Sequence, residues 1–169
     1  MEAIVLSRQE IPGVEEPDAH NIYAHKGSQM LYIQEKSFIG QIKLLSTLVN
    51  LGDFKLCAWL YPESQRNTLA GFMVVPHQGF KPVTTYEDGI IPSRTELIQA
   101  TESTLSAFRE SKSEIQAHCD SITLYIDGQF NWHAATVGHE GMCLVQDDRY
   151  LSQLQNAGFN VSTQPPDWW

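Results

Sequence analysis

The residue types most able to do chemistry gather in one stretch of the sequence, residues 127–148. It reads DGQFNWHAATVGHEGMCLVQDD and holds two histidines, a cysteine, a glutamate and three aspartates. Histidine and carboxylate side chains act as general acids and bases, and together with cysteine they bind metals. The question is whether the fold brings these side chains to one place.

Strand spacing argues against a metal site shared by His133 and His139. Six residues of extended chain span up to about 20 Å, whereas two nitrogens that bind one zinc ion each lie about 2.0–2.1 Å from it. The sequence also lacks GxGxxG, GxxxxGK[ST], HExxH, GxSxG and CxxC motifs. We therefore expect no metal and no cofactor, and we do not expect a nucleotide-dependent enzyme or a zincin.

The turn at Asp127-Gly128 decides where Trp132 and His133 point. A two-residue turn would set Gln129 and His133 among the apolar side chains of the preceding strand. A three-residue turn pairs Leu124 with Trp132 and aligns the apolar sets, so burial favours it. This register predicts that Trp132 lies in the core. His133 then lies on the opposite face, either in water or in a cleft.

Other reactive residues of the chain give weaker patterns. His139-Glu140 lies between two glycines, where we expect an exposed turn. Cys119 follows His118 directly, but neighbours on an extended chain point in opposite directions, so we do not expect a catalytic thiol.

The segment 77–92 is a long stretch without clear periodicity, and is either a binding loop or an irregular crossover. The tail QPPDWW either anchors a partner or folds back over the sheet. The candidates for catalysis or small-ligand binding are His133, His77 and Tyr86, and the candidates for partner binding are Phe80, Trp168 and Trp169.

Three helices are expected to support these residues. Residues 38–51 carry apolar side chains on most of their circumference, which predicts packing on two sides, against a sheet and against another helix or a partner subunit. Residues 93–112 form an amphipathic pattern that begins with a capping box, Ser93 and Glu96. A short helix at 148–157 has an aspartate cap and the exit glycine Gly158.

The remaining apolar segments read as strands. Residues 3–6 and the segments flanking Lys26-Gly27 suggest short strands, and 69–76 reads as a strand inside the sheet, because it is apolar on both faces. Further strands are expected at 54–61, 121–126, 130–137, 142–146 and 159–163. We predict one α+β domain, 1–169, in two layers: a mainly antiparallel sheet of six to eight strands with about three helices packed on it.

Composition limits the class of protein. The net charge is -9, and residues 86–169 carry twelve acids against four bases, so a nucleic-acid binder is not expected. No apolar run is long enough to span a membrane, and the N-terminus lacks the features of a signal peptide. Three widely spaced cysteines suggest reduced thiols and a cytoplasmic location.

The acidic second half either presents a negative face to a basic partner or serves solubility. We expect a small acidic cytoplasmic binding or accessory protein, of the inhibitor, immunity-protein or chaperone kind, which acts by protein-protein interaction without chemistry of its own. A homodimer is compatible with packing of residues 38–51 against a partner subunit. The alternative is an enzyme or small-ligand-binding protein with a pocket under the 77–92 loop.

Overall fold

The computed structural model describes residues 28–83 and 93–169. These residues form an α+β structure with four α-helices and a ten-stranded sheet in which every pair is antiparallel. The expected strand at 3–6 and the turn at Lys26-Gly27 lie outside the described residues. The strands are β1 Leu31–Gln34, β2 Lys55–Leu60, β3 Thr68–Leu69, β4 Phe72–Pro76, β5 Ser93–Thr95, β6 Ile98–Gln99, β7 Cys119–Tyr125, β8 Trp132–Val137, β9 Met142–Val145 and β10 Val161–Ser162; the helices are α1 Phe38–Val49, α2 Glu102–Glu110, α3 Lys112–His118 and α4 Leu151–Asn156, with a 3-10 turn, η1 Asp148–Tyr150.

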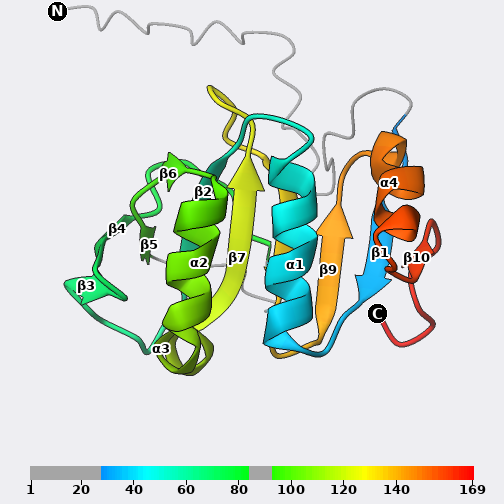
Figure 1. The fold of residues 1–169 in the computed structure, drawn as a ribbon. Helices are drawn as coiled ribbons and strands as arrows, with labels where there is room; N and C mark the ends of the chain where they lie inside the picture. Colours follow the sequence, from blue (N-terminus) through cyan, green and yellow to red (C-terminus); the bar gives the residue numbers. More distant parts are fainter. Residues whose placement is uncertain (1–27, 84–92) are drawn as a thin grey trace, which may run out of the picture.

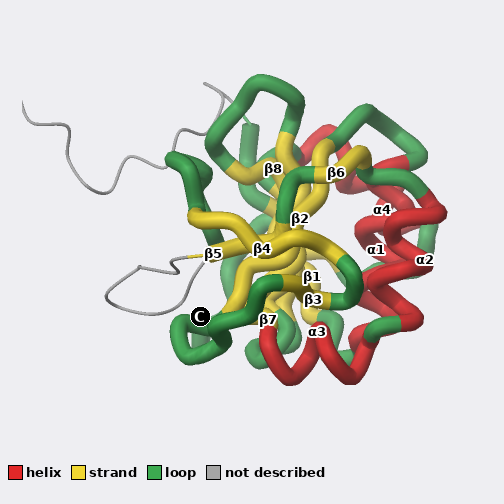
Figure 2. The backbone as a smooth tube through the Cα atoms, turned by 90° about the vertical axis from the view of Figure 1, so that its left-hand side faces the viewer, coloured by secondary structure: helices red, strands yellow, loops and turns green. Residues whose placement is uncertain are grey.

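The strand order is β10-β1-β9-β8-β7-β2-β5-β4-β3, and β6 also pairs with β2. More strands are present than the six to eight expected, because the segment predicted as one strand at 69–76 contributes to both β3 and β4, and the region predicted as a helix at 93–112 begins with β5 and β6. The helices gather on one side of the sheet (Figure 2), and α1 lies beside α2 in front of β7 and β9 (Figure 1).

The helix predicted at 38–51 is confirmed, as is the one predicted at 148–157. The Ser37 hydroxyl accepts a hydrogen bond from Gly40 N and starts α1, which ends at Val49 with Asn50 as its cap. The carboxylate of Asp147 caps η1, and Gly158 ends α4 with a φ of 92°. Local capping signals were sufficient at both places.

The helix predicted at 93–112 is wrong in its first half. Residues 93–95 and 98–99 are strands, with Arg94 paired to Trp59, and α2 begins only at Glu102. Thr101, not Ser93, forms the capping box, which it shares with Thr104. Pairing of β5 with β2 and β4, and of β6 with β2, engages the backbone of this segment and outweighs the short Ser-x-x-Glu signal.

The strand predicted at 69–76 is a hairpin instead. Ala70 and Gly71 both have positive φ, 49° and 83°, and reverse the chain between β3 and β4. This hairpin is the edge of the sheet and not its interior, and Met73 is 56% exposed on it. The prediction of an interior strand at 69–76 is therefore wrong, because the side chains of β4 are only partly buried although most of them are apolar.

The pairing of β7 with β8 differs from the predicted register. Leu124 pairs with Ala134, and after a register shift Tyr125 pairs with Trp132. The irregularity leaves both His133 and Ala134 on the helix side, whereas Trp132 packs on the opposite face near Phe80. The prediction that His133 faces water or a cleft is therefore wrong: it is 8% exposed, and its ring stacks on Phe54 at 5.2 Å.

Within residues 28–83 and 93–169, no helix has the length and apolar character that a membrane crossing requires.

Candidate functional site

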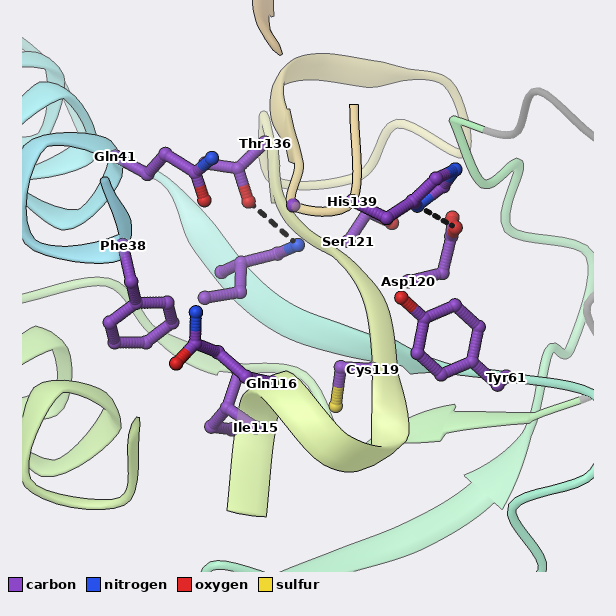
Figure 3. A pocket seen from close by; sticks show the side chains of 12 residues that line it. Phe38, Gln41, Tyr61, Ile115, Gln116, Cys119, Asp120, Ser121, Thr136 and His139 are labelled. Atoms are coloured by element: carbon purple, nitrogen blue, oxygen red, sulfur yellow. Dashed lines mark hydrogen bonds and ion pairs between the residues drawn. The ribbon is translucent and has the colours of Figure 1, made fainter. Parts of the chain in front are cut away.

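A cavity of about 140 Å³ lies at the end of the sheet where β7 begins and β8 ends. Figure 3 shows the side chains of Tyr61, Asp120 and His139 together, with Phe38, Gln41 and Ile115 across strand β7 from them. The lining residues are Phe38, Gln41, Tyr61, Ile115, Gln116, Cys119, Asp120, Ser121, Ile122, Thr136, Gly138 and His139. The cavity thus has a mixed lining, and its titratable side chains, Asp120 and His139, lie together at one end.

Asp120 occupies an irregularity in the pairing of β2 with β7. Trp59 pairs with Ser121 and Leu60 pairs with Cys119, so Asp120 has no partner residue on β2. An extra residue of this kind bends the strand and changes the direction of its side chain. The carboxylate of Asp120 consequently points toward His139, as Figure 3 shows.

Two backbone hydrogen bonds hold the neighbouring residues in place. Tyr61 N donates to the carbonyl of His118 at 2.9 Å, which sets Tyr61 beside the start of β7. Gly138 N donates to the carbonyl of Asp120 at 3.2 Å, which ties the turn between β8 and β9 to the same point. The three side chains therefore come from separate segments that meet at the irregular step of β7.

The carboxylate of Asp120 is buried without a hydrogen bond. Its side chain is 0% exposed, and neither oxygen accepts a hydrogen bond from any residue that the structure describes. Its contact is with His139, whose Nδ1 lies 3.3 Å from Oδ1. Burial raises the pKa of Asp120 to about 6; the charge of His139 lowers it, and that of Glu140 raises it.

His139 lies between this carboxylate and solvent. Its side chain is 34% exposed, its Nε2 is 3.4 Å from Oε1 of Glu140, and its ring centroid lies 6.3 Å from that of Tyr61. Such a pair can hold a proton, and the buried carboxylate can attract a cationic group. Cys119 adds no thiolate nucleophile, since burial raises the pKa of its thiol far above neutral.

Two of the residues predicted for a site, His133 and His77, lie apart in the structure. His133 is under Phe54 and Tyr150 on the helix side, whereas His77 is exposed, with Nδ1 accepting a hydrogen bond from Gly79 N. Phe80 packs edge-on against Tyr125, which is on the opposite face of the sheet from His133. Tyr86 lies outside the described residues. The structure thus does not place His77 and His133 in one pocket.

The terminal tryptophans stay largely outside the core. Trp168 is 54% exposed and Trp169 is 40% exposed, and the centroids of their rings lie 6.0 Å apart.

Sequence reasoning missed Asp120 and Tyr61 as site residues. The sequence pattern indicated His139 only as part of an exposed turn, and Asp120, which precedes the strand expected at 121–126, was not a candidate. What unites them is the irregular step in β7, which follows from strand pairing across the sheet.

Comparison of the chain with known protein families, with curated proteins and with solved structures finds no match. Among the residues that the structure describes, no group of three or more histidine, cysteine, aspartate or glutamate side chains is placed to hold a metal ion.

Proposed function

We propose that this chain is a small acidic binding or accessory protein that recognises a basic partner protein and performs no chemistry of its own. The observation that carries the proposal is the engagement of Arg149, the one base after Lys112. Its Nε lies 2.9 Å from both carboxylate oxygens of Asp147, and its Nη2 lies 2.5 Å from Oδ2. The carboxylate of Asp147 therefore already compensates the positive charge of Arg149.

Glu114 pairs with Arg66, and Asp120 and Glu140 contact His139, whereas three other carboxylates of this half have no such partner among the described residues. Asp127 and Asp167 are exposed and Asp148 is partly exposed, and none of the three forms an ion pair with a base in the described part of the chain. Like charges without counter-charges produce a negative surface potential, which attracts and orients a basic protein. The link between this chain and inhibitors, immunity proteins or chaperones is an analogy of size and charge.

The proposed location is the cytoplasm. Cys57, Cys119 and Cys143 are buried and unpaired, which suits a compartment that keeps thiols reduced. We also propose a homodimer through the outer side of α1, where Ile39 is 50% exposed. Sedimentation analysis at micromolar concentration tests this, and a monomer throughout would contradict it.

Affinity capture from the native cytosol tests the proposed function. The tagged chain should retain a basic protein at low ionic strength and release it as salt screens the charges. Asp127→Asn and Asp167→Asn should each weaken retention, whereas Glu63→Gln, an exposed acid of the first half, should not. Recovery of no basic protein, or equal effects of all three substitutions, would contradict the proposal.

A second function is favoured by one observation, the convergence of Asp120, His139 and Tyr61 on a cavity. A small-ligand-binding protein or an enzyme needs a concave site with titratable groups in altered environments. This site lies at the β7–β8 end and not at the residues first expected, His77 and His133. A thermal-shift screen of small metabolites tests it: a ligand should stabilise the wild type and leave Asp120→Asn unaffected.

A further inference from the structure

We propose that the carboxylate of Asp120 binds a lysine or arginine side chain of the basic partner, and that the side chain of His139 occupies this binding site in the free protein. The inference rests on the proposed function, since the cation would come from that partner. The acidic surface would attract any basic protein, whereas the buried carboxylate of Asp120 would bind one particular side chain of the partner.

The first argument is the state of the carboxylate. A buried charge is costly unless hydrogen bonds or an opposite charge compensate it. Asp120 receives no hydrogen bond from any described residue, and its contact with His139 is 3.3 Å long, longer than the roughly 2.7–2.9 Å of a charge-assisted hydrogen bond. The free protein therefore leaves the carboxylate poorly compensated, and an ammonium or guanidinium group would compensate it better.

The second argument is that the cover over Asp120 is a surface turn. His139 belongs to the turn between β8 and β9, flanked by Gly138 and by Gly141, whose φ is 64°. Its side chain is 34% exposed, in contrast to the fully buried carboxylate beneath it. Outward rotation of this one partly exposed side chain is the movement that the proposal requires.

The third argument is the shape and lining of the adjoining cavity. A volume of about 140 Å³ holds four or five groups the size of a water molecule, at roughly 30 Å³ each. That is room for most of a lysine side chain, which carries an ammonium on a four-carbon stem. On the Asp120 side of β7, the ring of Tyr61 lies beside Asp120 and His139 (Figure 3), and an aromatic ring can accept such a stem while the charged head lies against a carboxylate.

The proposal makes the two residues act in opposite directions. Asp120→Asn removes the charge and keeps the shape, so it should weaken binding of a cation. His139→Ala removes the cover, so it should strengthen the same binding. A merely structural role for the pair would weaken binding in both variants or change it in neither.

Two side-chain analogues serve as probes: n-butylammonium for lysine and n-propylguanidinium for arginine, with n-pentanol as the uncharged control. Chemical shifts of the full-length protein report binding in the wild type, Asp120→Asn, His139→Ala and the surface control Glu63→Gln. We expect at least one cationic probe to bind, at least about tenfold more weakly to Asp120→Asn and more tightly to His139→Ala, with n-pentanol inactive. The stronger of the two cations identifies the side chain.

Three results would overturn the inference: no cationic probe binding to His139→Ala, equal binding to wild type and Asp120→Asn, or n-pentanol binding as well as the cations. Thermal denaturation of each variant shows whether it is folded before titration. If the probes fail while capture still yields a basic protein whose retention depends on Asp127 and Asp167, the proposed binding site at Asp120 is wrong and the proposed function stands. If capture fails and the probes behave as expected, the proposed function is wrong and a cation site remains.

Discussion

At the scale of single residues, Asp120 is the feature that the rest of the molecule explains least. Its carboxylate is buried at an irregular strand position beside a partly exposed histidine, and it accepts no hydrogen bond from residues 28–83 or 93–169. Residues that reduce stability in this way are frequent at functional sites, because binding needs groups that are not yet satisfied. The stability of the free protein should therefore show the cost of this residue.

We expect Asp120→Asn to stabilise the protein at neutral and alkaline pH. The folded-state pKa of Asp120 is raised from 3.8 to about 6, so between these values the folded chain holds a proton that the unfolded chain has lost. Wild-type stability then falls as pH rises from about 4 to about 6 and stays lower above that range. The asparagine variant lacks this loss and should gain about 1–3 kcal/mol.

Urea denaturation at about pH 4.5 and about pH 8 measures this effect. The difference between variant and wild type should be small at the lower pH and largest at the higher one. Asp127→Asn, an exposed site, is the control and should differ little from wild type at either pH. A destabilised Asp120→Asn at pH 8 would mean that the contact with His139 outweighs the cost of burial.

His133 and Trp132 offer a second test at this scale. His133 stacks on Phe54 and meets Tyr150 edge-on, with ring centroids at 5.2 and 5.6 Å. We therefore expect His133→Ala to cost about 1–3 kcal/mol, and Trp132→Ala to cost about 3 kcal/mol. Equilibrium unfolding of both variants checks this. A cost below about 0.5 kcal/mol for His133→Ala would restore the surface position that the sequence suggested.

At the scale of elements, the parts that depend on local chemistry could be predicted and those that depend on pairing could not. The helix at 38–49 begins after Ser37, whose side chain caps it as expected, and Asp147 caps the 3-10 turn that leads into the helix at 151–156. Residues 93–99 instead became strands through backbone pairing with β2, which is distant in sequence. No local pattern contains that information.

The true start of the second helix gives a prediction at this scale. Thr101→Ala should destabilise the protein by about 1 kcal/mol, because Thr101 and Thr104 exchange capping hydrogen bonds at the start of α2. Ser93→Ala should change stability by less than about 0.5 kcal/mol, since Ser93 is in a strand and caps no helix. Thermal denaturation compares the two variants. A larger effect at Ser93 would favour a helix that begins there.

At the scale of the whole molecule, the sequence predicted the α+β class and the antiparallel sheet, and it located the acidic half. It did not reveal the cavity, because Tyr61, Asp120 and His139 belong to segments whose meeting point depends on one irregular step in β7. Two of the residues expected to share a pocket under the 77–92 loop, His77 and His133, lie apart for a similar reason: the register shift between β7 and β8 leaves His133 on the helix side of the sheet. Composition thus supports the proposed binding of a basic partner, while the geometry indicates where one of its side chains would be held.

The association rate between this protein and its captured basic partner tests the central claim most directly. Attraction between a negative surface and a basic protein speeds encounter, and salt screens that attraction. We predict that the rate constant falls at least about tenfold as ionic strength rises from about 0.01 M to about 0.15 M, and that Asp127→Asn combined with Asp167→Asn lowers it at low salt. A rate constant that is independent of salt and unchanged in this variant would contradict recognition through the acidic surface.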